Sequence, residues 1–291
     1  MASNLTKRIA FAVIAIPALL GVAYLGGWYL TLLLSAAGAL AAREIYDFAR
    51  RQGIEPLGVV GTIGAALMPV MMALPLLAPG RAAIMVREGH WFAAGLLLLL
   101  TLTLWRRGTT RRPLTAAAVT LFGVMYASWL PSFALMLRHP LPGTFANDAS
   151  VGMALLFYPL VLTWVGDTVA MTAGRTFGGP KMAPVVSPNK TWSGGIGGLL
   201  GSIAVSVIWG ATVFQRAGIA MTWLELVIFG AIIGVAGQVG DVVESMFKRE
   251  VGVKDSSAII PGHGGVLDRL DSQYFAIPAA ALLFKAWGIA S

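Results

Sequence analysis

The sequence predicts an all-α protein, a polytopic transmembrane bundle of about nine helices. Of its 291 residues, 57% are hydrophobic and only 12% are charged, which is about half the charged share of an ordinary soluble domain. Apolar runs close to the ~20 residues needed to cross a hydrocarbon core recur along the whole chain. Cysteine is absent, which excludes disulfides, thiolate metal sites and a cysteine nucleophile.

Nine apolar runs follow one another, separated by short polar segments. They cover residues 9–25, 28–42, 57–79, 91–105, 114–137, 151–172, 194–214, 223–245 and 273–290. The first run is interpreted as an uncleaved helix and not a signal peptide, because no small-residue cleavage site follows it and the next run begins at once. We expect about five helices in an N-terminal part, 1–150, and the catalytic motifs in a C-terminal part, 151–291.

Lysine and arginine are divided unequally between alternate loops. The N-terminus and every second loop carry 16 of them, whereas the intervening loops carry 4. Since cytoplasmic loops of membrane proteins are enriched in these residues, we expect a cytoplasmic N-terminus and an outside C-terminus. The net charge of +8 then reflects topology and contact with anionic lipid headgroups, so nucleic acid is not an expected partner. The absence of an organellar transit peptide favours a bacterial inner membrane.

Proline and glycine have distinct expected roles within the apolar runs. Pro69, Pro75 and Pro131 lie inside runs and predict kinks. The glycine-rich stretch that begins at Gly194 opens an apolar run and lacks the strand–turn–helix setting of a nucleotide-binding loop. It is interpreted as a small-residue face for close helix packing.

Charged residues gather on one face of the helix expected to end the eighth run. Asp241, Glu244, Ser245 and Lys248 are spaced at i, i+3, i+4 and i+7. Such a stripe cannot face lipid, so we expect it to face a polar cavity. The alternative is an ion-pair cluster that only fixes helix packing.

The segment that follows the eighth run contains further carboxylates, several cations and a histidine. Pro-Gly and Gly-Gly turns surround His263, and Asp268 and Asp271 lie three residues apart. Carboxylates without cysteine suit Mg²⁺ better than zinc, and the cations nearby suit phosphate oxygens. Together they predict phosphoryl or nucleotidyl transfer. Whether His263 touches substrate or is structural stays open. The cations are Lys248, Arg249, Lys254 and Arg269.

A second candidate site lies around residues 187–192. Ser187 is a good N-cap and Pro188 a good first helical residue, so we expect the seventh helix to begin here. The helix start, with Lys190 and Thr191, would bind an anion at the cytoplasmic boundary. The alternative is an ordinary capped helix. Asp167, in the sixth run, could bind metal, orient Lys190 or pair with Arg175, and the sequence leaves these open.

These motifs resemble the phosphatidate cytidylyltransferase family, also called CDP-diacylglycerol synthases. The C-terminal motif of the family, S-x-x-K-R, four residues, K-D and then P-G-H-G-G-x-x-D-R-x-D, is matched from Ser245 to Asp271. Its S-P-x-K-T-W segment is matched by residues 187–192, and its D-T-x-A and G-R-x-x-G stretch by residues 167–178. Asn189 and Ser193 depart from the lysine and glutamate that many members carry there.

The resemblance implies an enzyme that converts CTP and phosphatidic acid to CDP-diacylglycerol and pyrophosphate in phospholipid biosynthesis. It further implies a nine-helix fold, a divalent-metal centre on Asp241 and Asp268, and a homodimer in the membrane lipid. We expect one or two Mg²⁺ ions, with Glu244 as a further ligand. Expected catalytic residues are Asp241, Asp268, Lys248 and Asp271; expected substrate-binding residues are Ser187, Lys190, Thr191, Arg249, Lys254, His263, Arg269 and Asp167.

Three other functions are alternatives to cytidylyl transfer to phosphatidic acid. A CTP-dependent lipid-alcohol kinase, or a cytidylyltransferase for another lipid, would use a similar set of groups, but the full motif favours cytidylyl transfer to phosphatidic acid. A cation transporter is disfavoured because the charges cluster at one membrane face and no inverted repeat of broken helices is visible.

Overall fold

The computed structural model describes residues 4–78, 80, 84, 86, 89–140, 148–260 and 264–289, with side chains described only from Val13 onward, except Ile14. The chain forms two compact units. Unit 1 comprises Met1–Leu135 and Asp255–Arg269, and unit 2 comprises Met136–Lys254 and Leu270–Ser291. The predicted all-α class is confirmed, since helices account for most of the described residues.

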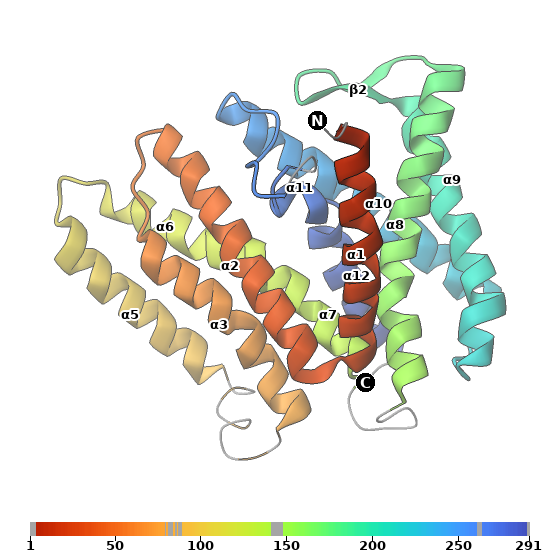
Figure 1. Ribbon diagram of the computed structural model, residues 1–291, viewed down its shortest axis with the longest axis horizontal. Helices are drawn as coiled ribbons and strands as arrows, with labels where there is room; N and C mark the ends of the chain where they lie inside the picture. The colour runs from red at the N-terminus through yellow and green to blue at the C-terminus, as the bar shows by residue number, and fades with distance from the viewer. Residues whose placement is uncertain are drawn as a thin grey trace. The chain divides into compact units, whose positions relative to one another are not determined.

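Unit 1 consists mainly of apolar helices that pack side by side, and Figure 1 shows α2, α3, α5 and α6 as neighbours. Its elements are α1 (Asn4–Leu25), α2 (Gly27–Arg51), α3 (Gly58–Leu77), α5 (His90–Arg107), α6 (Pro113–Val124), the π-helical turn η1 (Met125–Trp129), most of α7 (Leu130–Arg138) and most of the short α11 (Leu267–Leu270).

Tyr46 of α2 lies at the centre of this packing and is fully buried. Its hydroxyl donates a hydrogen bond to the Thr120 carbonyl of α6, at 2.8 Å. Gly61 of α3 and Gly123 of α6 flank the ring so closely that a Cβ at either position would lie within 2.4 Å of a Tyr46 atom. Glycine at these positions therefore allows α3 and α6 to approach the ring.

Unit 2 contains the longest helices and one small β-hairpin. Its elements are α8 (Ala149–Phe177), β1 (Lys181–Ala183), β2 (Ser187–Thr191), α9 (Trp192–Trp209), the π-helical turn η2 (Gly210–Phe214), α10 (Trp223–Glu250) and α12 (Gln273–Ala286). Figure 1 shows the hairpin at one end of α8 and α9, which it connects. Tyr158, Phe214, Phe229 and Phe284 form a buried aromatic cluster in this unit.

The glycine-rich stretch from Gly194 is a packing face, as predicted. A Cβ at Gly197 would lie 2.6 Å from Ala173 Cβ, and a Cβ at Gly198 would lie 2.9 Å from Ala170 Cβ. Both alanines belong to α8, so the small residues bring α8 and α9 into close contact.

The predicted start of the seventh helix was wrong. Residues 187–191 form strand β2, which pairs antiparallel with β1, and the helix begins four residues later at Trp192. The N-cap is Thr191, whose hydroxyl oxygen accepts a hydrogen bond from Gly194 N at 3.2 Å. Ser187-Pro188 misled the prediction because proline's fixed φ suits a strand edge as well as a first helical turn, and it holds the preceding residue extended.

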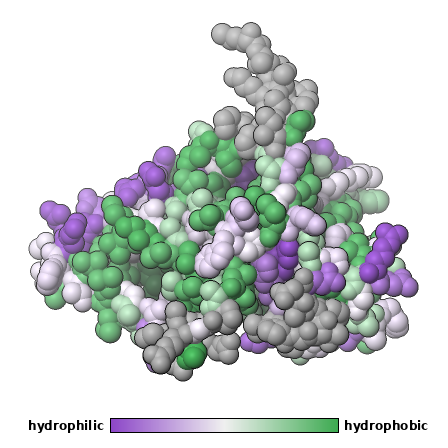
Figure 2. Space-filling view, turned by 60° about the horizontal axis from the view of Figure 1, so that its bottom comes forward, coloured by the Kyte–Doolittle hydropathy of each residue, from purple (hydrophilic) through white to green (hydrophobic). Residues whose placement is uncertain are grey.

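Each of the nine predicted apolar runs is largely helical within the described residues, although the last run leaves the helix after Ala286. In the part of the chain that the structure describes, five helical segments are long and apolar enough to cross a membrane, namely Gly58–Leu77, Pro113–Arg138, Ala149–Phe177, Trp192–Phe214 and Trp223–Glu250. Figure 2 shows apolar side chains, in green, at the surface of the face that it displays. Large side chains such as Trp105 and Leu114 are 79% and 81% exposed. These features indicate an integral membrane protein. That all nine helices cross the membrane stays a prediction.

Candidate active site

A hydrophilic cavity of about 690 Å³ lies in unit 2, between α8, the β-hairpin, the start of α9 and α10. Three of its lining residues are cationic and two are acidic, and Gln238 adds an amide. Four predicted site residues line it, which are Asp167, Lys190, Thr191 and Asp241. Arg175 and Lys181 are the further cations. Cations beside carboxylates in an open cavity suit a ligand that carries several phosphates.

Lys190 and Asp241 form an ion pair at this cavity, with Nζ 2.7 Å from Oδ2. The two side chains are 23% and 29% exposed, so the pair is partly screened by solvent. Ser245, one turn along α10, lies 3.4 Å from the other oxygen of Asp241. Asp241 therefore holds Lys190 at the cavity, while Asp167 lines the same cavity from α8.

The hairpin positions Lys190 through local backbone geometry. Gly178 and Gly179 have φ values of +60° and +102°, which only glycine adopts readily, and they turn the chain out of α8. Trp192 N then donates a hydrogen bond to the Pro180 carbonyl at 3.0 Å, and Lys181 pairs with Thr191 in the hairpin. These contacts fix β2 beside the cavity, and α9 begins at the residue that follows β2.

The predicted polar stripe on α10 divides into two pairs of groups. Asp241 lines the cavity and Ser245 lies beside it, whereas Glu244 is 1% exposed and its Oε2 lies 2.5 Å from Lys248 Nζ. Lys248 is itself largely buried. A buried carboxylate requires such a partner, because an unpaired charge away from water is costly. The catalytic role of Lys248 stays a prediction.

Asp271 lies beside α10 in the same unit. A Cβ at Gly240 would lie 2.6 Å from the Asp271 carbonyl oxygen, so glycine permits the close approach. Burial raises the pKa of the Asp271 carboxyl above its ordinary value, and the nearby negative charge of Asp241 raises it further. A hydrogen bond from Ser272 N to Asp271 Oδ1, at 2.6 Å, partly offsets this.

Asp268 belongs to unit 1, where it accepts hydrogen bonds from backbone and side-chain groups of its own loop. Its Oδ2 accepts from Ser256 N at 2.8 Å and from Gly265 N at 2.8 Å. The neighbouring Arg269 is exposed. Asp268 is thereby fixed within the 255–269 segment. The predicted role of His263 lies outside the described residues, together with Pro261 and Gly262.

The remaining predicted site residues of unit 2 lie at the end of α10 and in the hairpin. Arg249 is exposed and donates hydrogen bonds to the carbonyls of Val186 and Val253, at 3.3 and 3.0 Å. The first bond connects α10 to the hairpin turn. Lys254 is exposed, and Ser187 pairs with Ala183 at the other end of β2 from Thr191.

The donor groups of the cavity suit a magnesium ion that is shared with a nucleotide. Among the residues that the structure describes, no three His, Asp or Glu side chains are grouped so as to hold a metal ion. Mg²⁺ at nucleotide sites is usually held by only one or two carboxylates, together with substrate phosphates and water. Asp241, which lines the hydrophilic cavity, fits that mode. The metal roles of Asp268 and Glu244 stay predictions.

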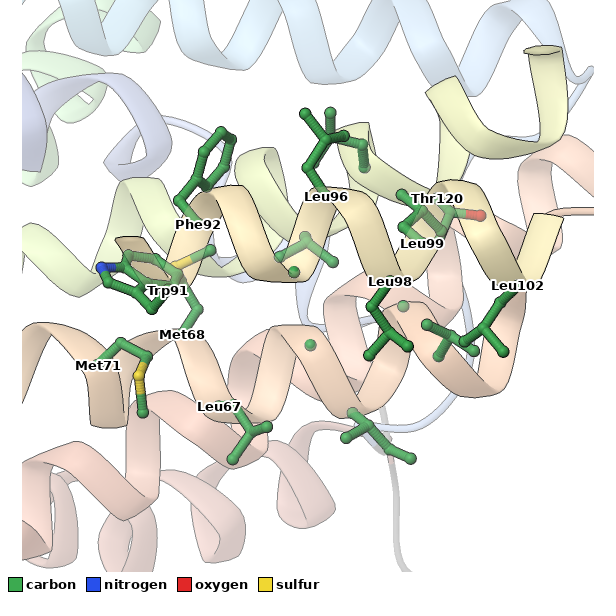
Figure 3. Close-up of a pocket in the computed structure, with 17 residues that line it drawn as sticks. Leu67, Met68, Met71, Trp91, Phe92, Leu96, Leu98, Leu99, Leu102 and Thr120 are labelled. Atoms are coloured by element: carbon green, nitrogen blue, oxygen red, sulfur yellow. The ribbon is translucent and has the colours of Figure 1, made fainter. Parts of the chain in front are cut away.

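A second cavity, in unit 1, has a different chemistry. It occupies about 430 Å³ between α3, α5 and α6, and Figure 3 shows leucine, methionine and aromatic side chains around it. The hydroxyl of Thr120 already accepts a hydrogen bond from Leu57 N and donates one to the Ala116 carbonyl. Among the described residues that line it, none is charged, so they suit an apolar ligand and not a triphosphate.

Several polar residues that line the hydrophilic cavity were absent from the predicted site residues, among them Arg175, Lys181 and Gln238. Gln238 lines the hydrophilic cavity and donates a hydrogen bond to the Gly195 carbonyl at 3.1 Å. It precedes Asp241 by three residues, so its position on the same helical face could have revealed it. Glu44 is a carboxylate that follows the second apolar run by two residues. Burying a carboxylate near the membrane is energetically costly, and this cost could have marked Glu44 as a functional residue.

Comparison with known proteins gives a consistent result over nearly the whole chain. The model of the cytidylyltransferase family matches residues 6–287. The chain is 32% identical to the phosphatidate cytidylyltransferase of Haemophilus influenzae, over 94% of this chain and 96% of the relative. It is 32% identical to that of Brucella abortus, over 97% and 93%, and 30% identical to the chloroplastic phosphatidate cytidylyltransferase 5 of Arabidopsis thaliana, over 99% and 73%.

Proposed function

This chain belongs to the cytidylyltransferase family, and we propose that it transfers the cytidylyl group of CTP to phosphatidic acid. The products are CDP-diacylglycerol and pyrophosphate. The proposed substrates are those that the names of its relatives imply, and the motif between Ser245 and Asp271 supports them. The chain's apolar helices suit a substrate that resides in a bilayer.

The observation that carries this proposal is the hydrophilic cavity with the Lys190–Asp241 ion pair. A nucleoside triphosphate brings several negative charges, which Lys190, Arg175 and Lys181 can neutralise from β2, α8 and β1. The start of α9 lines the same cavity with Gly194 and Gly195, where the helix dipole favours an anion. Both substrates are anionic, so neutralisation lowers the repulsion between them as they meet.

The chemistry requires little covalent participation by the protein. A phosphate oxygen of phosphatidic acid forms a bond to the α-phosphorus of CTP, while the bond from that phosphorus to the β-phosphate bridging oxygen breaks. The departing electron pair leaves with pyrophosphate. A phosphomonoester is largely ionised near neutral pH, so it is a competent nucleophile without a general base. The protein's contribution is then positioning and charge stabilisation.

We propose Asp241 as a carboxylate that helps hold Mg²⁺ with CTP. The bound ion would neutralise charge on the triphosphate oxygens. In the described structure Asp241 is paired with Lys190. When nucleotide and metal arrive, Lys190 can exchange its carboxylate partner for a phosphate oxygen, which remains a short movement for a flexible side chain. Asp167, which lines the cavity from α8, would place a second carboxylate near the metal and the cations.

The setting in the cell is also proposed. The positive-inside count favours a cytoplasmic active site, where CTP is available, and bacterial relatives favour the inner membrane. A homodimer, which the family resemblance implies, is a further prediction. Sedimentation or native mass spectrometry of the detergent-solubilised protein would measure its oligomeric state.

The experiment that tests the reaction uses purified protein in detergent micelles with phosphatidic acid, CTP and Mg²⁺. We expect CDP-diacylglycerol and pyrophosphate in equal amounts, and none of either when EDTA removes the metal. Diacylglycerol in place of phosphatidic acid provides the comparison with a lipid-alcohol kinase. Release of CDP and formation of a phospholipid from diacylglycerol would contradict the proposal.

A further inference from the structure

Glu44 is a buried carboxylate of α2, and it lies outside the residues so far assigned a role. It is 1% exposed. Its two oxygens accept four hydrogen bonds, all from the 256–267 segment. Ser256 Oγ and Leu267 N approach Oε2 at 2.8 and 2.9 Å, and Ser257 Oγ and Val266 N approach Oε1 at 2.6 and 3.0 Å.

Both ends of the 256–267 segment are therefore held by one side chain. Ser256 and Ser257 lie near its start, whereas Val266 and Leu267 lie at its end, where α11 begins with Leu267. These residues are more than 200 positions from Glu44 in the chain. Four donors offset the cost of burying a charged carboxylate, and hydrogen bonds to charged groups are stronger than neutral ones.

Ser256 connects Glu44 to Asp268. Its hydroxyl lies 2.8 Å from Glu44 Oε2 and 2.9 Å from Asp268 Oδ2. A serine has a single hydroxyl proton, so it donates to only one of these carboxylates at a time. Ser256 N donates separately to Asp268 Oδ2, which keeps the serine beside Asp268 in either case. The placement of the Asp268 carboxylate is thus coupled to Glu44 through one residue.

Gly264 and Gly265 lie so close to the two carboxylates that neither position has space for a Cβ. A Cβ at Gly265 would lie 2.4 Å from Glu44 Oε1 and 2.0 Å from Ser256 Oγ. A Cβ at Gly264 would lie 2.6 Å from Asp268 Oδ2, and Gly264 has a φ of +82°. The loop backbone consequently passes directly against both carboxylates, which only glycine permits.

We propose that Glu44 is a positioning residue that holds the 256–267 segment so that Asp268 is correctly placed for catalysis. This inference rests on the proposed function, in which Asp268 is a catalytic residue. Glu44 acts through the segment and through Ser256, and it does not itself touch substrate. The segment comes from the C-terminal motif, so a helix from the N-terminal part of the chain completes its structure.

The test compares Glu44→Gln with Glu55→Gln, in the unmodified chain and in an Asp268→Asn background. Glutamine keeps the shape of Glu44 but replaces one accepting oxygen with a donor, which faces the donors of the loop. Loss of an outer-shell partner of this kind typically costs about 10- to 100-fold in activity. We expect that loss in kcat for Glu44→Gln and none for Glu55→Gln, because Glu55 is exposed and pairs with Arg107.

The double variant separates positioning from a general structural role. If Glu44 acts through Asp268, Glu44→Gln has no further effect on kcat once Asp268 is asparagine. Equal loss in both backgrounds would overturn the proposal. Ser257→Ala removes a single donor to Glu44 and provides a milder variant, for which we expect a smaller loss that also vanishes in the Asp268→Asn background.

Amide hydrogen exchange supplies a readout that does not depend on turnover. We expect Glu44→Gln to accelerate exchange in peptides that cover Val266 and Leu267, while peptides from α8 and α9 keep their protection. Unchanged exchange at Val266 and Leu267 would refute the positioning role. If the unmodified chain makes no CDP-diacylglycerol, the proposed function fails, and the exchange result still decides whether Glu44 holds this segment.

Discussion

Lys190 Nζ lies 2.7 Å from Asp241 Oδ2, so an ion pair joins β2 to α10 at the hydrophilic cavity. The two residues lie 51 positions apart in the chain. The pair brings together one cation for phosphate and one carboxylate suited to metal. The first prediction concerns these two residues.

Asp241→Asn should reduce turnover on the order of a thousandfold, because removing a metal ligand costs several kcal/mol of transition-state stabilisation. Lys190→Ala should reduce it by about 10²- to 10³-fold, as expected for a lost charge-stabilising donor. Steady-state assays with saturating phosphatidic acid would measure both. Asp47→Asn and Lys285→Ala are the matched controls, since Asp47 pairs with Arg50 at an exposed site and Lys285 is exposed on α12. Near-normal turnover of Asp241→Asn would disprove the assigned role.

Thr191→Val should destabilise the protein by about 1 kcal/mol, because valine has the shape of threonine but cannot cap α9. Thr191→Ser should retain most of the stability, and Ser187→Ala should have little effect on it. Thermal unfolding in detergent, followed by circular dichroism, would compare the three. A larger loss for Ser187→Ala than for Thr191→Val would place the helix start back at Pro188.

Gly197→Ala should destabilise the packing of α8 on α9 by about 1–3 kcal/mol, since the added methyl would lie 2.6 Å from Ala173 Cβ. Gly95→Ala is the control, because no described atom lies within 4 Å of its Cβ position. There alanine should be neutral, or stabilising by up to about 1 kcal/mol through helix propensity. Denaturant midpoints of the two variants would test this, and equal midpoints would argue against tight packing at Gly197.

Asp271 predicts a specific pH dependence of stability. Its pKa in the folded protein is raised above 3.8, so the protonated form favours folding at low pH. That contribution is lost as pH rises from 3.8 through the folded-state pKa. Asp271→Asn cannot ionise, yet its side-chain oxygen can still accept from Ser272 N. It should therefore gain stability relative to the unmodified protein as pH rises through this window.

Asp148→Asn is the control of opposite sign. Hydrogen bonds from Ser150 lower the pKa of Asp148, so ionised Asp148 stabilises the fold above its ordinary pKa and that stability is lost as pH falls. Melting temperatures across the acidic range would show the two slopes. The same slope for both variants would contradict the assignment for Asp271.

The sequence predicted the helices well because their signal is local. An apolar run of membrane length is recognised from its composition alone. Helical spacing was likewise enough to predict one shared face of α10 for Asp241, Glu244, Ser245 and Lys248. The hairpin at 181–191 was missed because a three-residue strand carries too little periodicity to detect. The helix start was consequently predicted at Pro188 instead of Trp192.

Pairings between distant residues could not be predicted from spacing. Glu244 and Lys248 have the i,i+4 spacing that predicts contact on one helix, whereas Lys190 and Asp241 lie on different elements, so their pairing has no signal in the spacing. Glu44 was overlooked for the same reason, since all its partners lie in the 256–267 segment. The π-helical turn before Pro131 has a local explanation, because proline lacks the N–H that would continue the regular helix.

The central claim is cytidylyl transfer, and the most direct measurement follows the fate of the individual phosphorus atoms of CTP. Purified protein would be supplied with phosphatidic acid and Mg²⁺, and with CTP labelled at either the α- or the γ-phosphorus. The proposed function predicts that the α-label enters the lipid and the γ-label appears in pyrophosphate. Entry of the γ-label into lipid, with the α-label retained in CDP, would contradict it.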